Sequence, residues 1–181
     1  MRIDGPQSAL AVLVPEAERL VAPFREKYDP SAALGMPAHI TLLYPFLPPD
    51  AIDAAVLDRL TTCIGQLAPF DFSLTTIGYF DPGVLYLAPT PDEPFRQLTL
   101  AVWQGWPQAP PYGGRFAEII PHLTIADVSD ARLRDRIATE FAQVAGAELP
   151  IRARATTATL LEKRSARWRV HTAIPLGARP V

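Results

Sequence analysis

Two short stretches decide the fold of this chain: 39-HITLLYPF-46 and 121-PHLTIAD-127. Each contains a histidine, an apolar residue, a threonine and a second apolar residue, and the content of β-branched and aromatic residues is typical of strands. Side chains at positions i and i+2 of a strand point to the same face. The sequence therefore predicts two strands that each present an imidazole beside a hydroxyl on one face and apolar side chains on the other.

Similar elements surround the two stretches and indicate an internal duplication. In chain order we predict a strand at 8–14, a helix at 16–28, a strand at 38–44, a helix at 51–67, strands at 70–80 and 84–87 joined by a turn at 81–83, a helix from 94 to 106, a loop at 107–114, a strand at 121–127, a helix at 130–145, one or two strands within 149–161 and a strand at 168–174. The order strand, helix, hairpin thus occurs twice, with 47 residues from His39 to Tyr86 and 46 from His122 to Trp168.

The duplication defines the expected architecture. We expect a single bilobal α+β domain over residues 1–181, with motif-bearing copies at about 38–87 and 121–176. Each lobe is expected to be an antiparallel sheet with helices on its outer face. A pseudo-twofold axis would relate the lobes, so that the two motif strands face a central cleft.

Composition and charge place the chain among globular proteins. Of the 181 residues, 49% are hydrophobic and the formal net charge is −2, which excludes a disordered chain and argues against a protein that coats nucleic-acid backbones. Residues 131–181 hold ten basic and four acidic side chains, a net charge of +6, so residues 1–130 carry −8. The basic C-terminal third suits an anionic ligand, and the acidic remainder favours a small or short ligand over long RNA.

Location and assembly follow from features that the sequence lacks. The apolar run at 9–14 is far shorter than the roughly 20 residues that cross a bilayer, and the N-terminus lacks a signal-peptide pattern. Cys63 is the single cysteine, so an internal disulfide is excluded. We expect a cytoplasmic monomer with no membrane association and no obligate protein partner. Arginine supplies 15 of the 17 basic residues, a composition associated with GC-rich bacterial genomes.

Two of the three histidines, His39 and His122, occupy matching motif positions and form the candidate catalytic pair. The ordinary histidine pKa is near 6.5, so one imidazole can accept a proton from an attacking hydroxyl while the other donates a proton to the leaving oxygen. At phosphorus these two roles require opposite sides of the reacting centre. The hydroxyls of Thr41 and Thr124 can donate to nonbridging phosphate oxygens. This scheme needs no metal and no cofactor.

The two HxTx motifs, the duplication and the length resemble the 2H phosphoesterases, specifically the 2′-5′ RNA ligase and cyclic phosphodiesterase group. The resemblance implies metal-independent hydrolysis of 2′,3′-cyclic phosphates to 2′-phosphates, on RNA ends or small nucleotides, and in some relatives reversible 2′-5′ joining of RNA ends. It also implies that His39 and His122 are the acid/base pair and that Thr41 and Thr124 bind the phosphate. Which histidine is the base stays open.

Arginines and aromatic residues are further candidates for binding substrate. Arg164, Arg167 and Arg169 lie beside the last strand, and Arg115 precedes the second motif; an arginine at such a place can bind phosphate bidentately. Trp168 is a candidate for stacking on a nucleobase, as are Phe80 and Tyr112.

Two alternatives remain. A metal hydrolase could use His39, His122 and Asp127, but in a regular strand Asp127 points away from the face of His122, and the HExxH, GxSxG and GxxxxGK[ST] signatures are absent. The second is a non-catalytic module that binds nucleotides or RNA ends on the same fold. Turnover of a cyclic phosphate, rather than binding alone, discriminates between an enzyme and such a module.

Overall fold

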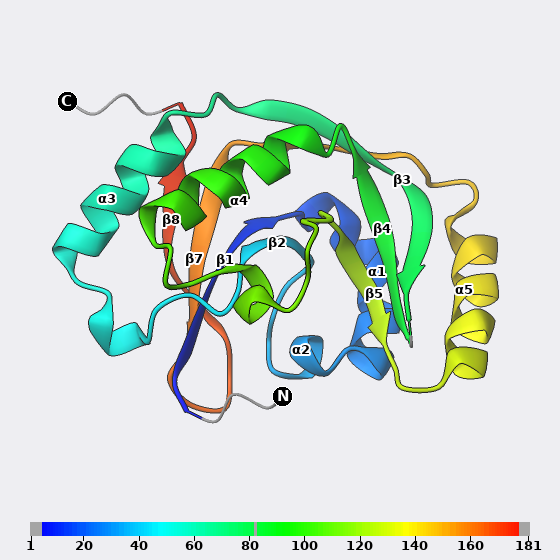
Figure 1. Ribbon diagram of the computed structural model, residues 1–181. Helices are drawn as coiled ribbons and strands as arrows, with labels where there is room; N and C mark the ends of the chain where they lie inside the picture. The colour runs from blue at the N-terminus through cyan, green and yellow to red at the C-terminus, as the bar shows by residue number, and fades with distance from the viewer. Residues whose placement is uncertain (1–4, 82, 178–181) are drawn as a thin grey trace.

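The computed structural model describes residues 5–81 and 83–177. Within this part of the chain, eight strands form one strongly curved antiparallel sheet in the order β6-β3-β4-β5-β2-β1-β7-β8 (Figure 1). The strands are β1 (Gln7–Leu13), β2 (His39–Leu43), β3 (Phe70–Phe80), β4 (Val84–Thr90), β5 (Leu123–Asp127), β6 (Ile151–Ala155), β7 (Thr157–Lys163) and β8 (Arg169–Pro175).

Each helix begins with a proline in its first turn or behind an aspartate that caps it. The helices are α1 (Pro15–Tyr28), α2 (Pro30–Ala33), α3 (Ala54–Gly65), α4 (Glu93–Gly105) and α5 (Ala131–Ala145), with short 3-10 segments η1 (Pro49–Ala51) and η2 (Pro111–Gly114). The carboxylate of Asp53 accepts a hydrogen bond from the backbone N–H of Val56, and that of Asp130 accepts from Arg132, so two of the orphan N–H groups at these helix starts are satisfied.

The predicted elements are confirmed to within a few residues, with two differences. The short helices α2 and η2 were not expected, and the predicted helix at 51–67 begins only at Ala54, because Asp53 caps it after the separate 3-10 turn η1. The predicted turn at 81–83 includes Pro82, which lies outside the described residues, although the flanking strands β3 and β4 do pair as a hairpin.

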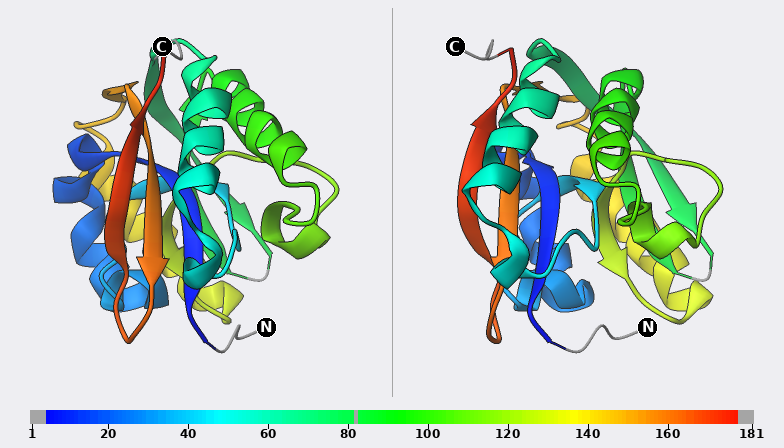
Figure 2. Two further views of the ribbon diagram at one scale, coloured as in Figure 1. Left: turned by 90° about the vertical axis from the view of Figure 1, so that its left-hand side faces the viewer. Right: turned by 60° about the vertical axis from the view of Figure 1, so that its left-hand side comes forward.

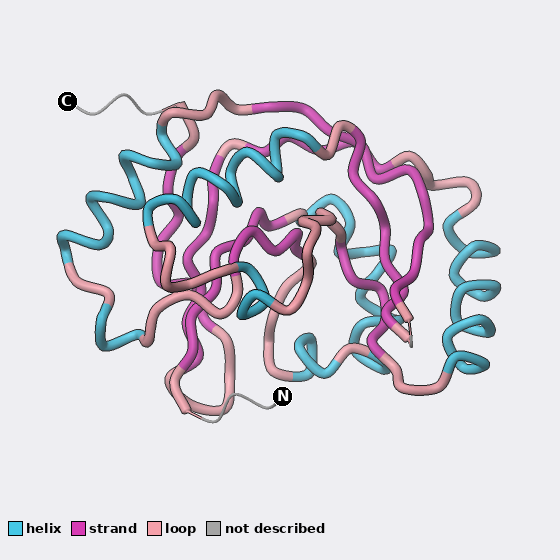
Figure 3. The backbone as a smooth tube through the Cα atoms, viewed as in Figure 1, coloured by secondary structure: helices cyan, strands magenta, loops and turns pink. Residues whose placement is uncertain are grey.

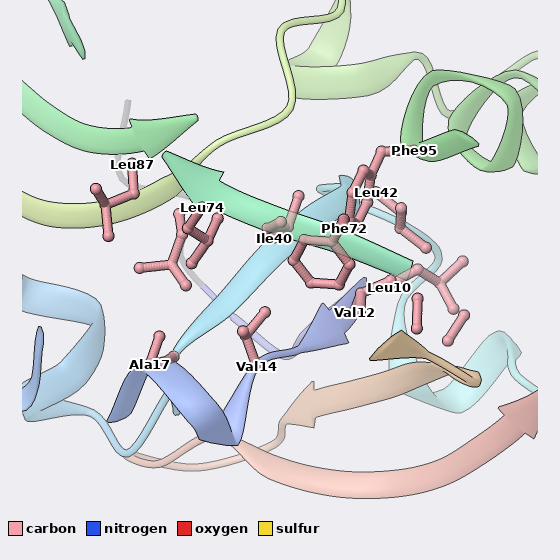
Figure 4. Packing of buried hydrophobic residues seen from close by; sticks show 14 of the residues in the cluster. Leu10, Val12, Val14, Ala17, Ile40, Leu42, Phe72, Leu74, Leu87 and Phe95 are labelled. Carbon is pink, nitrogen blue, oxygen red and sulfur yellow. The ribbon is translucent and has the colours of Figure 1, made fainter. Parts of the chain in front are cut away.

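Four long helices cover the sheet in two pairs. Helices α3 and α4 pack together over the end of the sheet that contains β8, β7, β1 and β2, whereas α1 and α5 pack over the end that contains β3, β4 and β5 (Figures 1 and 2). The core between helices and sheet is apolar: Leu10, Ile40, Leu74 and Leu87 are completely buried, and Figure 4 shows their packing. No helix in the described ranges is long and apolar enough to cross a membrane.

The α+β class and the helices on the outer face are confirmed, but the two lobes are halves of one sheet rather than separate sheets. The halves are β6-β3-β4-β5 and β2-β1-β7-β8, and a backbone pairing of Ile40 with Leu123 joins them at the centre. The predicted copies do not coincide with these halves. After the strand of His39, the chain crosses over, and the β3–β4 hairpin completes the half that carries His122. Tyr86 and Trp168 are therefore not equivalent in space.

Candidate active site

Strands β2 and β5 lie side by side at the centre of the sheet (Figure 3); His39 is the first residue of β2, and His122 immediately precedes β5. The apolar members alternate into the core as predicted: Ile40 and Leu123 are fully buried. The histidines and threonines of both motifs are half-buried on the opposite face. Because the pairing is antiparallel, the motifs run in opposite directions from the Ile40–Leu123 pair, which directs His39 toward Thr124 and His122 toward Thr41. The fold thus gathers the four motif residues on one small area.

Both imidazoles are anchored in the same way. Nδ1 of His39 lies 2.8 Å from the carbonyl oxygen of Pro37, and Nδ1 of His122 lies 2.7 Å from the carbonyl oxygen of Ile120. A carbonyl oxygen can only accept, so each Nδ1 carries the proton that it donates. In the neutral ring Nε2 is then the unprotonated nitrogen, free to accept a proton from a ligand. Each imidazole is therefore oriented by a backbone carbonyl group two residues earlier in the sequence.

Burial lowers the pKa of both histidines. For His39 the pKa falls to about 4, chiefly through burial; the hydrogen bond to Pro37 opposes this change, and the charges of Arg25 and Asp29 act in opposite directions. Burial also lowers the pKa of His122, against the hydrogen bond to Ile120. At neutral pH both rings are therefore predominantly neutral in the free protein.

The charge that acts on His39 belongs to a buried ion pair that sequence reasoning missed. Arg25 Nη2 lies 3.0 Å from Asp29 Oδ2, with side chains only 2% and 5% exposed. The same nitrogen donates to the carbonyl oxygen of Met36 at 3.0 Å, so the pair fixes the turn that leads into β2. The sequence did contain one signal for an ion pair, the spacing of four residues between Arg25 and Asp29 at the end of a predicted helix. It contained no signal that the pair is buried.

Aromatic rings surround His122. The ring centroids of Phe80, Tyr86 and Tyr112 lie 5.0, 5.4 and 6.4 Å from that of the imidazole. Tyr86 reaches the site because β4 pairs with β5 and sets Tyr86 opposite Thr124. Its ring also crosses Gly78 of β3, where an added Cβ would lie 2.6 Å from the ring. Phe80 and Tyr112 were candidate stacking residues, whereas Tyr86 was not, because its place depends on the crossover of β3 and β4.

The predicted arginines lie in three different environments. Arg115 is exposed beside η2, and its Nε donates to the carbonyl oxygen of Tyr112 at 3.2 Å. The guanidinium of Arg167 lies against Gly35. Arg164 is held by Asp50, Glu162 and the carbonyl oxygen of Pro49. Of the three, only Arg115 is hydrogen-bonded to a residue that contacts a motif histidine.

Trp168 lies on the face of the sheet that carries Thr41, but it is mostly covered. It is 8% exposed and belongs to a small apolar cluster with Ala9, Ala11, Met36 and Leu161. Ala11 is the backbone partner of Thr41, which places this cluster beside the first motif. Tyr44 also packs edge-on against Trp168, with ring centroids 6.0 Å apart. The indole thus packs beside the first motif, and little of its surface is available to a ligand.

Strand alternation does not determine which face of the sheet Asp127 occupies, because β5 is irregular. A register shift in the β4–β5 pairing sets Tyr86 opposite Thr124 and Leu85 opposite Ala126, so β5 is irregular between the motif and Asp127. The predicted orientation of Asp127 required a regular strand, and that condition is not met here. Over residues 5–81 and 83–177, no three His, Cys, Asp or Glu side chains come together as a metal site.

Two cavities lie outside the motif residues. One of about 250 Å³ lies between α4 and the segment after η2, and Trp103, Pro111, Tyr112 and Phe116 are among its lining residues. The other, of about 500 Å³, lies at the edge formed by β3 and β6. Neither of these two cavities is lined by His39 or His122, and the smaller one reaches the motif residues through Tyr112.

Comparison with known proteins places this arrangement in a family. The model of the 2′-5′ RNA ligase superfamily matches residues 13–167, and the chain belongs to that family. A provisionally named phosphoesterase of Bacillus cereus (strain G9842) is 33% identical over 121 residues, which cover 61% of this chain and 63% of that protein. A similarly named protein of Bacillus licheniformis is 30% identical over 119 residues, covering 64% of this chain and 68% of its own length. The match to the Bacillus cereus relative thus spans less than two thirds of the length of either protein.

Solved structures confirm the fold. The Escherichia coli protein LigT, solved in complex with 3′-AMP, has a TM-score of 0.59 at 19% identity, with 96% of this chain and 99% of that chain covered. The protein TT0787 of Thermus thermophilus has a TM-score of 0.56 at 20% identity, with 96% and 100% covered. The chain thus has the fold of LigT-type 2H phosphoesterases.

Proposed function

We propose that this protein is a metal-independent phosphodiesterase that hydrolyses 2′,3′-cyclic phosphates of nucleotides or RNA ends to 2′-phosphates. The observation that carries the proposal is the matched anchoring of two imidazoles on adjacent antiparallel strands, each with Nδ1 bound to a carbonyl and Nε2 left for a ligand. A threonine hydroxyl accompanies each ring. The complex of LigT, which has this fold, with 3′-AMP agrees with a nucleotide ligand.

In the proposed reaction, Nε2 of one histidine takes a proton from water as the water oxygen attacks phosphorus. The bond between phosphorus and O3′ breaks, and Nε2 of the other histidine gives its proton to O3′. The phosphate stays on O2′. Thr41 and Thr124 donate to the nonbridging oxygens, where charge changes during the reaction.

The surroundings of the two rings favour His39 as the base in hydrolysis. Burial lowers the pKa of His39 to about 4, which keeps the ring neutral and able to accept a proton; the charge of Arg25 adds to this effect and that of its partner Asp29 opposes it. His122 is then the acid. Burial lowers its pKa as well, and the negative charge of the bound phosphate opposes this effect and favours the protonated ring in the complex.

Several narrower expectations belong to the same proposal. Substrate contacts by Arg115 and Arg167 are proposed; Arg164 and Trp168 would have to leave their present partners to make such contacts. Joining of RNA ends through 2′-5′ bonds, a cytoplasmic location and a monomeric state are likewise proposed. Ligase activity is measured by incubating an RNA that ends in a 2′,3′-cyclic phosphate with one that begins with a 5′-hydroxyl.

The decisive experiment is hydrolysis of 2′,3′-cyclic AMP in the presence of EDTA, with chromatography that resolves 2′-AMP from 3′-AMP. The variants His39→Asn and His122→Asn keep a donor near the Nδ1 position and remove Nε2, and each should lower kcat/KM by roughly 10² or more. His171→Asn is the matched control, since His171 lies beside Glu162 rather than in a motif.

Each outcome has a distinct meaning. Activity that survives EDTA, yields 2′-AMP and depends on both motif histidines supports the proposal. Activity that EDTA abolishes supports a metal hydrolase instead. Binding of 2′-AMP without turnover of any cyclic phosphate identifies a nucleotide-binding module.

A further inference from the structure

Tyr112 contacts both motifs with one side chain, although it belongs to neither. Its hydroxyl interacts with the side chain of Thr41. Its ring stacks on the imidazole of His122, with centroids 6.4 Å apart and planes inclined by 21°. The residue therefore lies where the phosphate-binding threonine of one motif meets the histidine of the other.

The backbone holds Tyr112 in this place through an unusual turn. Tyr112, Gly113 and Gly114 have successive φ angles of 52°, 65° and 74°. Glycine adopts this left-handed conformation readily, whereas an aromatic residue does so at a conformational cost that is often found at functional sites. The N–H of Tyr112 donates to the carbonyl oxygen of Tyr44 at 2.6 Å. This bond ties the turn to the end of β2, the strand that carries Thr41.

The phenol is a proton donor under all ordinary assay conditions. Burial raises the pKa of Tyr112 to about 12, so the neutral hydroxyl form is present throughout the neutral range. Contact of the ring with His122 and with Phe116, whose centroid is 5.7 Å away, limits the directions that the hydroxyl can take. An oriented neutral donor beside Thr41 is suited to an anionic oxygen.

We propose that Tyr112 is an additional phosphate-binding residue, whose hydroxyl donates to a nonbridging phosphate oxygen together with that of Thr41. The inference rests on the proposed function for the identity of the ligand. It adds a third hydroxyl to the two that the motifs supply, and it makes the two halves of the site unequal. Tyr112 belongs to η2, which lies outside the two motif strands.

The test is Tyr112→Phe, which keeps the ring against His122 and removes only the hydroxyl. For 2′,3′-cyclic AMP, kcat/KM should fall by roughly 10- to 100-fold, the usual effect of losing one hydrogen bond to a charged group. Titration calorimetry with 2′-AMP should show a comparable loss of affinity. Tyr79→Phe is the matched control, because Tyr79 is 59% exposed and packs against Arg134 instead; thermal melting verifies that both variants fold.

The two readouts separate this inference from the proposed function. Wild-type-like values for Tyr112→Phe in both assays overturn the role of Tyr112 and leave the function intact. Faster turnover by the variant also overturns it, since the hydroxyl would then be withholding Thr41 from the phosphate. If the wild type binds 2′-AMP but has no turnover, the proposed function fails, and the titration of the variant still decides the inference. Absence of both turnover and 2′-AMP binding in the wild type overturns both.

Discussion

His39 should make the stability of this protein depend on pH in a defined window. Its pKa is about 4 in the folded chain and 6.5 in the reference state. Above pH 6.5 the ring is neutral in both states and contributes no pH dependence. Between pH 6.5 and 4 the unfolded chain binds a proton that the folded chain does not, so stability is lost as the pH falls.

The size of the loss follows from the two pKa values. A full difference of 2.5 pKa units corresponds to about 3 kcal/mol, reached below pH 4. At about pH 5 the unfolded ring is almost fully protonated and the folded ring only about one-tenth protonated, so the loss is about 2 kcal/mol. This is a measurable share of the roughly 5–15 kcal/mol that stabilises a typical domain.

Urea unfolding of the wild type and of His39→Asn, each at about pH 7.5 and about pH 5, measures this contribution. Asparagine keeps a donor for the carbonyl oxygen of Pro37 and cannot be protonated. Other titrating groups affect both proteins alike, so the wild type should lose about 2 kcal/mol more than the variant. Equal losses, within about 0.5 kcal/mol, would show that His39 is not held neutral and would remove the argument for it as the base.

Further predictions address activity and packing. Since the pKa values of both motif histidines are lowered, kcat/KM should be maximal below pH 6.5; a buffer series with a maximum above pH 7.5 would contradict this. Thr41→Val keeps the side-chain shape without the hydroxyl, and kcat/KM should fall roughly 10²-fold with little change in melting temperature. Gly78→Ala would place a Cβ 2.6 Å from the ring of Tyr86 and should cost about 1–3 kcal/mol in urea unfolding, whereas Gly105→Ala, with Cys63 Sγ 3.5 Å away, should not. Arg25→Met leaves a buried carboxylate unpaired and should cost about 3–5 kcal/mol by the same assay.

The sequence by itself determined the elements and the composition of the motif pair. Strand alternation alone predicted that Ile40 enters the core while His39 and Thr41 share the opposite face, and burial confirms this. The reason is local: the side-chain period of a strand is two residues, so composition and spacing define its two faces. Prolines, glycines and capping aspartates marked most helix and strand ends for similarly local reasons.

The tertiary structure alone decided which segments meet. The crossover of the β3–β4 hairpin into the half that carries His122 brings Tyr86 to the site, and no local pattern records it. Burial of the Arg25–Asp29 pair near His39, and the turn that carries Tyr112 to Thr41, likewise depend on contacts between segments distant in the chain. Sequence periodicity reports which face a side chain occupies, but partners and pKa values depend on what the folded chain packs against that face.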